Sequence, residues 1–311
     1  MDRWAAVAAT GRRQLGLITT EQLLEAGLTR SAIKWAVRDR RLERVGRRLY
    51  RLAGAPTSWR QRAKEALLRC GEHARLSHGS AAHLWRLDGF EYPPWPIEVT
   101  VPHGSYVSQQ VGVRVHQSRL DDSRHVVLGL EVGSVGRTLI DLAVTLDDEA
   151  LEIALDSAQR RFRHLGPWLL ALAETDAARG MAPLAHLAGL VLERQGQHAE
   201  SALEVRVWRG LRRARHLPPP RLQHEVFDGA GYVMRVDFAW PQERVALHAD
   251  GYRWHARRDA WDTDATQRNR LSAAGWKSLI VTSATLDSDW LDTLASLLRA
   301  RSPQLSLFQS P

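Results

Sequence analysis

Residues 19–52 read TTEQLLEAGLTRSAIKWAVRDRRLERVGRRLYRL. Threonine stands before each of two segments with helical spacing of apolar residues, and threonine is a favoured cap at the start of a helix. We therefore predict a first helix that ends at Leu24, a break at 26–28, and a second helix over about 29–40. Apolar residues then alternate on both sides of Gly46, which predicts a two-stranded hairpin. Two helices joined by a short turn and followed by a hairpin form a winged helix-turn-helix.

The second predicted helix separates apolar from basic residues. Ile33 and Val37 lie four positions apart, which places them on one face of a helix. Three basic residues repeat at the same spacing on a different face, so we expect this helix to contact DNA while its apolar face packs inward. Two arginines at the tip of the hairpin extend the basic surface. The expected DNA-binding residues are Arg30, Lys34, Arg38, Arg47 and Arg48.

Positive charge is concentrated at the start of the chain. The protein has 43 Lys and Arg residues against 35 Asp and Glu residues, a net charge of +8. Residues 1–75 contain 17 of the cations and 7 of the acids, so all of the net positive charge lies in the first quarter. Such an asymmetry is the usual electrostatic footprint of nucleic-acid binding, with a solvated basic face as the alternative explanation. We expect double-stranded DNA as the partner.

Length and composition exclude several classes of protein. A chain of 311 residues with 44% hydrophobic and 25% charged residues is typical of a soluble protein with two or three domains. No apolar run approaches the roughly 18–20 residues that span a bilayer, and the first residues lack the apolar core of a secretory signal. The single cysteine, Cys70, excludes an internal disulfide and a cysteine-rich zinc site. We expect a cytoplasmic protein without membrane contact, either a monomer or a homodimer.

The predicted elements divide the chain into three parts. Residues 1–55 hold the winged helix, and residues 56–195 hold a mixed α/β and helical region. Residues 196–311 follow the order α-β-β-β-α-β, which is sufficient for one α/β core. The expected fold class is therefore a multidomain α+β protein that consists of a winged helix, a middle α/β domain and a C-terminal α/β domain.

The densest group of candidate catalytic residues lies on two neighbouring predicted strands. Asp237 lies in the first strand, and His248 and Asp250 lie in or just after the next. Because alternate side chains of a strand share one face, the two strands can present these three residues to one cleft. A pair of carboxylates near a histidine suits a hard divalent cation and proton transfer, as phosphodiester hydrolysis requires.

Four segments of this C-terminal part resemble a known family. They are Ser201–Glu204, Arg235–Phe238, Val245–His255 and Arg268–Val281. In this order and spacing they look like the core of very short patch repair endonucleases and of related uncharacterised proteins of the PD-(D/E)xK nuclease superfamily, over about residues 198–300. The resemblance implies a restriction-endonuclease-like α/β fold and activity as a Mg²⁺-dependent DNA endonuclease or nickase.

The resemblance also implies roles for individual residues. Asp237 matches the metal-binding aspartate, and Ala249 matches a residue whose backbone carbonyl contacts the metal. His255 matches the proposed general base, and Asp264 matches an acidic partner on the following helix. Glu204 matches a glutamate near the metal. The implied catalytic residues are Asp237, His255, Asp264 and Glu204, and the implied metal-binding residues are Asp237, Ala249, Asp250 and His248.

Two positions depart from the pattern of this family. His248 stands where the uncharacterised relatives usually carry a glutamate, and Asp250 stands where repair enzymes often carry a histidine. Imidazole is a poorer ligand than carboxylate for Mg²⁺, so a site that uses His248 would favour Mn²⁺. The structural alternatives are a core position for His248, a structural role for His255, and a capping box formed by Ser201 and Glu204.

Three segments of the first half are similar to the antitoxin family of type IV toxin–antitoxin systems, of the AbiEi kind. They are Gly16–Ala53, Leu76–Ala82 and Arg137–Ala143. This resemblance implies a winged helix with an attached α/β domain. Two functions therefore follow as expectations. One is a divalent-metal-dependent DNA endonuclease with a winged-helix DNA-binding region, and the other is a DNA-binding transcriptional regulator or antitoxin whose nuclease-like domain is inactive.

Overall fold

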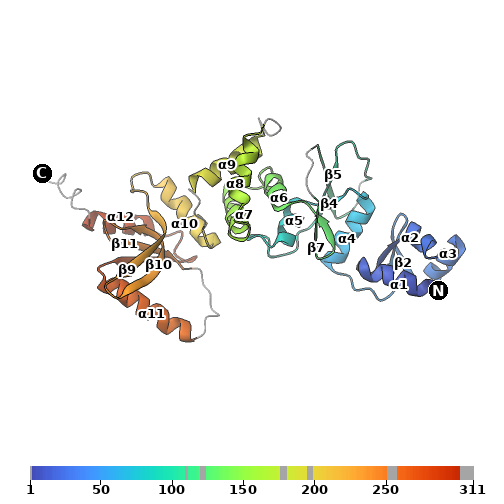
Figure 1. The fold of residues 1–311 in the computed structure, drawn as a ribbon, viewed down its shortest axis with the longest axis horizontal. Coiled ribbons are helices and arrows are strands. Elements are labelled where there is room, and N and C mark those ends of the chain that lie inside the picture. The colour runs from blue at the N-terminus through green and yellow to red at the C-terminus, as the bar shows by residue number, and fades with distance from the viewer. Residues whose placement is uncertain are drawn as a thin grey trace. The chain divides into compact units, whose positions relative to one another are not determined.

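The computed structural model shows a mixed α+β protein with two compact units (Figure 1). Unit 1 comprises residues 1–146 and 175–187, and unit 2 comprises residues 147–174 and 188–311. Twelve helices and three sheets lie in the described residues, which are 2–108, 111–119, 124–175, 181–194, 199–250 and 258–301, without the side chains of 258–265. None of these helices is long and apolar enough to cross a bilayer. The predicted α+β class is confirmed.

The first part of unit 1 is a winged helix. Its helices are α1 (Arg3–Arg13), α2 (Thr20–Glu25) and α3 (Arg30–Arg38). Its strands are β1 (Leu17–Thr19), β2 (Leu42–Gly46) and β3 (Leu49–Leu52), which form an antiparallel sheet in the order β1-β3-β2. The predicted helix-turn-helix and hairpin are confirmed.

Local sequence determines where these elements begin and end. Thr19 caps α2 in a capping box with Gln22, and the hydroxyl of Thr29 accepts a hydrogen bond from the Ala32 N–H at the start of α3. The helix α3 ends two residues earlier than predicted, because Arg40 has a left-handed backbone with φ of 56°. The buried core of the winged helix includes Ile18, Leu23, Ile33, Ala36 and Leu42.

The rest of unit 1 includes an α/β domain around a five-stranded sheet. The sheet has the order β6-β5-β4-β8-β7 and mixes parallel with antiparallel pairs. Its strands are β4 (Arg75–Leu76), β5 (Ile97–Pro102), β6 (Val113–Ser118), β7 (His125–Val127) and β8 (Leu130–Val132). Its helices are α4 (Trp59–Cys70), α5 (His78–Trp85) and α6 (Val135–Leu142), and α5 packs against α6 and β5.

Unit 2 is built on a four-stranded sheet. Its strands are β9 (Arg221–Asp228), β10 (Gly231–Trp240), β11 (Val245–Ala249) and β12 (Lys277–Val281), in the order β12-β11-β10-β9. The first three strands are antiparallel, and β12 pairs parallel with β11. The helices in this half of the chain are α7 (Asp148–Arg161), α8 (Leu165–Ala173), α9 (Ala182–Glu193), α10 (Ala202–Arg213), α11 (Arg258–Ala273) and α12 (Trp290–Arg301). The sequence α10-β9-β10-β11-α11-β12 confirms the predicted order of elements.

Helices cover both faces of this sheet. On one face α10 and α12 pack against Phe238, Trp240 and Leu247. On the other face α11 packs against Val236 and Ala246, and Figure 1 shows it on the opposite side of the strands from α12. The apolar residues of 236–240 and 245–247 are therefore buried, and Asp237 lies among them.

Candidate functional site

The helix α3 presents basic side chains on its exposed side. Arg30, Lys34 and Arg38 are exposed, whereas Ile33 and Ala36 are buried against the winged-helix core. The spacing of four residues places the three cations along one side of the helix. The structure thus brings together the three residues that were predicted to contact DNA.

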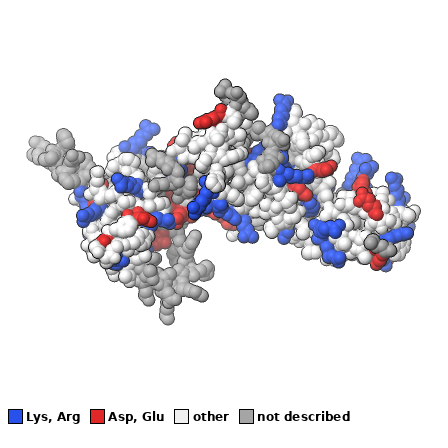
Figure 2. Space-filling view, viewed as in Figure 1, with Lys and Arg blue, Asp and Glu red and all other residues white. Residues whose placement is uncertain are grey.

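The two predicted residues of the wing lie at its tip. Arg47 and Arg48 form the turn between β2 and β3, and both are exposed. Arg48 also forms an ion pair with Glu21 of α2 at 3.5 Å, which is weak because both side chains are in solvent. Figure 2 shows Lys and Arg side chains projecting from this part of the chain, at the right of the view. The wing therefore adds cations to the surface of unit 1.

Trp35 is a candidate residue that the sequence reasoning did not identify. It lies on α3 directly after Lys34, and its side chain is 53% exposed. The guanidinium of Arg41 lies 5.1 Å from the centre of the Trp35 ring and 5.6 Å from that of Trp4. This cation–π contact orients the exposed Trp35 ring. In the sequence, Trp35 directly follows Lys34, a predicted DNA contact, and this position could have identified it as a candidate.

A second candidate site lies in unit 2, where Glu204 and Asp237 lie near each other. Glu204, in the first turn of α10, is only 5% exposed. Burial, and to a smaller extent the charge of Asp237, raises the pKa of Glu204 to about 7. Burial also raises the pKa of Asp237. A hydrogen bond of 2.9 Å from the backbone N–H of Ala249 lowers this pKa but has the smaller effect. The structure thus brings together two of the predicted catalytic carboxylates.

Glu204 also has a structural role at the start of α10. The hydroxyl of Ser201 accepts a hydrogen bond from the Glu204 N–H at 3.2 Å and donates one to its carboxylate at 3.0 Å. The reciprocal bond to the carboxylate comes from the N–H of Glu200 at 2.7 Å rather than from that of Ser201. The predicted cap is therefore present, with a modified form of the capping box.

Gln223 of β9 completes this carboxylate cluster and was not predicted. Its amide Nε2 donates a hydrogen bond to Glu204 Oε2 at 3.0 Å. The register of β9 and β10 places Gln223 opposite Asp237, and its backbone is left-handed with φ of 48°. Gln223 Oε1 is buried without a hydrogen-bond partner among the described residues. A buried acceptor without a donor is costly, so this oxygen suits a further donor or a cation.

The other predicted residues of unit 2 are placed differently around this cluster. The side chain of Asp250 is 52% exposed and lies 3.4 Å from Arg268. His248 alternates along β11 with Leu247, which packs beneath α10 and α12, so the imidazole lies on the face that α11 covers. Two further residues lie outside the described part of the chain: His255 and, for its side chain, Asp264.

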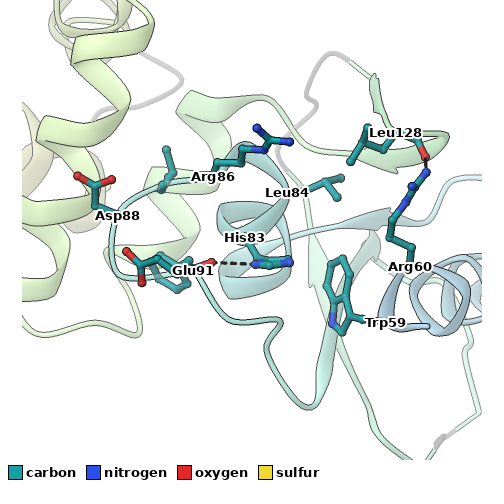
Figure 3. A pocket seen from close by; sticks show the side chains of 10 residues that line it. Trp59, Arg60, His83, Leu84, Arg86, Asp88, Glu91 and Leu128 are labelled. Atoms are coloured by element: carbon teal, nitrogen blue, oxygen red, sulfur yellow. Dashed lines mark hydrogen bonds between the residues drawn. The ribbon is translucent and has the colours of Figure 1, made fainter. Parts of the chain in front are cut away.

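The middle domain contains a pocket of about 430 Å³ (Figure 3). The ring of His83 lies in its wall, with Nδ1 2.8 Å from the carbonyl oxygen of Phe90, and packs edge-on against Trp59 at 4.8 Å. The charged residues that line the pocket are Arg60, Arg86, Asp88 and Glu91. Their formal charges sum to zero.

Comparisons with known proteins find one family profile, two relatives and one solved structure. A family profile described as "Transcriptional regulator, AbiEi antitoxin" matches residues 9–53. Uncharacterized protein MT2308 and uncharacterized protein Rv2248, from two strains of Mycobacterium tuberculosis, are each 30% identical to this chain over 207 residues, which cover 66% of the chain and 73% of each relative. The crystal structure of RV2827C protein from Mycobacterium tuberculosis shares 18% identity over 71% of this chain and 87% of that one, with a TM-score of 0.32.

Proposed function

This chain belongs to the family of the uncharacterized proteins MT2308 and Rv2248 of Mycobacterium tuberculosis, and we propose that it is a DNA-binding transcriptional regulator of the AbiEi antitoxin kind. The observation that carries this proposal is the exposed basic surface of α3 and the wing. This surface lies within residues 9–53, the part of the chain that resembles AbiEi regulators. The AbiEi resemblance is thereby confirmed for the winged helix, and the endonuclease resemblance stays a prediction.

The dimensions of α3 suit the major groove. An α-helix with its side chains is about 10–12 Å across, and the groove is about 12 Å wide. Recognition helices contact base edges through their N-terminal residues, which assigns Arg30 to base contact. Arginine binds the O6 and N7 of guanine through two hydrogen bonds. Lys34 and Arg38 then lie farther along the groove, where lysine and arginine neutralise phosphates.

Selection from a random pool of DNA duplexes tests this proposal. The full chain should enrich a recurring sequence. Arg30→Ala should relax the preference at one base position by about 1–3 kcal/mol, whereas Lys34→Ala should weaken binding to all sequences alike. Enrichment of no recurring sequence, or an identical preference in Arg30→Ala, would contradict base recognition by α3.

The carboxylate cluster of unit 2 supports a second candidate function, the metal-dependent cleavage of DNA. Glu204, Asp237 and Gln223 Oε1 together offer the oxygen ligands that Mg²⁺ prefers. Hydrogen bonds from Ala249 and Ser201 hold the two carboxylates in position. Bound Mg²⁺ would supply positive charge for phosphodiester hydrolysis. The residues present therefore fit this ion.

Supercoiled plasmid is the substrate that tests the second candidate. The wild-type chain should convert the plasmid to nicked or linear DNA with Mg²⁺ and not with EDTA. Asp237→Asn should abolish cleavage, whereas Asp287→Asn, which changes an exposed aspartate of the same unit, should leave it intact. A protein that binds DNA but cleaves none with Mg²⁺ or Mn²⁺ would leave the regulator as the function of this chain.

A further inference from the structure

Three potential metal ligands meet in the middle domain. His78 lies at the first position of α5, Glu98 on β5 and His116 on β6. One ligand atom of each lies within 4.8 Å of the others. Because β5 and β6 are paired in parallel and α5 packs against β5, the three residues belong to one packed assembly within unit 1.

His78 is held so that one ring nitrogen is engaged by the protein. Its Nδ1 lies 3.1 Å from the hydroxyl oxygen of Ser77 and 3.9 Å from Asp141 Oδ2. Arg137 in turn donates a hydrogen bond to Asp141 Oδ1 at 2.7 Å. Histidine ligands of metals commonly donate their second ring N–H to a carboxylate or another acceptor, which orients the metal-binding nitrogen. Asp141 and Ser77 lie where they can accept the Nδ1–H of His78, which leaves Nε2 as the metal-binding atom.

Glu98 is also oriented before any ligand is present. Its Oε2 accepts the backbone N–H of Gly79 at 2.9 Å, and its Oε1 lies 3.4 Å from His116 Nε2. A glycine permits this approach, because a Cβ at position 79 would lie 3.1 Å from Oε2. Arg114 lies 3.6 Å from Oε1, but its side chain is 59% exposed and can turn into solvent. The Glu98 side chain is only 13% exposed.

The two imidazoles lie face to face. The rings of His78 and His116 are 3.7 Å apart between centroids, with an angle of 19° between their planes. Two cations would repel each other at this distance, so the arrangement favours at least one neutral ring. Neutral imidazole is the form that binds metal ions.

We propose that His78, Glu98 and His116 bind one divalent transition-metal ion, with Zn²⁺ as the best match. Two imidazole nitrogens and one carboxylate are a known ligand set for Zn²⁺, whereas Mg²⁺ and Ca²⁺ prefer oxygen ligands throughout. Ligands in a tetrahedral Zn²⁺ site lie roughly 3.3 Å apart, from metal–ligand distances of about 2.0–2.1 Å. The ligand atoms lie within 4.8 Å of one another, and the two stacked rings would rotate out of their present arrangement to bring them to this spacing. Three protein ligands leave a fourth position open to solvent or to a small molecule.

Zinc titration of the full chain tests this site. The background carries Glu204→Gln and Asp237→Asn, so that the carboxylate cluster of unit 2 does not contribute. After treatment with a chelator, the protein should take one tightly bound Zn²⁺, measured by competition with a chromophoric chelator. Zn²⁺ should also raise the unfolding temperature, because an ion that binds only the folded state stabilises it. A folded protein that gains neither bound Zn²⁺ nor stability would overturn the proposal.

Substitutions in the same background locate the ion. His116→Ala should weaken Zn²⁺ binding at least tenfold, and so should Glu98→Gln, whose amide oxygen can still accept the Gly79 N–H. The matched control is His73→Ala, which removes an exposed histidine from the same domain and should leave the affinity unchanged. Unfolding curves in EDTA identify variants that are folded without metal. Zn²⁺ binding that persists in folded His116→Ala and Glu98→Gln would overturn the assignment.

Discussion

Glu204 of α10 and Gln223 of β9 are joined by a hydrogen bond of 3.0 Å between the glutamate Oε2 and the glutamine Nε2. The backbone of Gln223 is left-handed, and Asp237 lies on the neighbouring strand β10. Burial works against ionisation of Glu204, while this bond and those from Ser201 and Glu200 favour it. Burial has the larger effect, which makes the cluster sensitive to pH.

The stability of unit 2 is expected to fall as pH rises through about 7. Glu204 has a pKa of about 7 in the folded protein against an ordinary value of 4.5. Folding therefore favours the protonated form, and the resulting stabilisation is full below about pH 4.5 and is lost as pH rises through 7. The effect amounts to about 3 kcal/mol. Glu204→Gln should flatten this part of the pH dependence, measured by urea unfolding between pH 5 and 8 in EDTA.

Glu225→Gln is the matched control for this experiment, because Glu225 is an exposed glutamate of the same unit. It should keep the wild-type pH dependence. Some slope should remain in Glu204→Gln, since burial also raises the pKa of Asp156 to about 6. A slope in Glu204→Gln equal to that of the wild type would show that Glu204 is not the titrating group.

Ser201→Ala should destabilise unit 2 by about 1 kcal/mol. The substitution removes the oxygen that accepts the Glu204 N–H, and loss of a serine cap typically costs this amount. It also removes a donor to the Glu204 carboxylate, so the pKa of Glu204 should rise further. Urea unfolding at pH 7 measures the loss, with the exposed Ser283→Ala as control. Equal stability of the two variants would show that the cap does not contribute.

Trp35→Ala should weaken DNA binding without changing its salt dependence. Tryptophan carries no charge, so its loss should not change the number of counterions that binding releases, whereas its apolar contact with the duplex, for example with a thymine methyl group, is lost. Its 53% exposure predicts little change in folding stability. Fluorescence anisotropy with a labelled duplex at several salt concentrations measures both quantities. The control is Trp168→Ala, another exposed tryptophan, and equal affinity of the two variants would exclude Trp35 from the interface.

Local signals explain what could be predicted of the winged helix. The caps Thr19 and Thr29 and the alternation around Gly46 act within a few residues, and the observed elements follow them. For residues 56–195 the sequence predicted a mixed α/β and helical region but not the order of the five strands. β4 has two residues and β7 has three, which is too short for an alternating pattern to be recognised.

In the candidate sites, too, residues within recognisable sequence segments could be predicted, whereas contacts between distant segments could not. Asp237 and Glu204 were predicted because they stand in recognisable segments, but Gln223 joins them through a left-handed backbone and a strand register that no local pattern specifies. His78 and His116 meet only because the middle sheet brings their elements together. The catalytic and metal-binding roles predicted for Asp237 and Glu204 stay predictions. The same holds for Ala249, His248, Asp250, His255 and Asp264.

The salt dependence of DNA binding tests the central claim most directly, because each phosphate neutralised adds about 0.9 to the slope of log K against log salt concentration. The α3 variant, Arg30→Ala/Lys34→Ala/Arg38→Ala in the full chain, should reduce the magnitude of that slope by roughly 2, because Lys34 and Arg38 are the two residues assigned to phosphates. The matched variant removes three exposed arginines of unit 2: Arg213→Ala/Arg215→Ala/Arg299→Ala. It should bind with the wild-type slope. An unchanged slope in the α3 variant, or an equal reduction in both variants, would contradict DNA binding through α3.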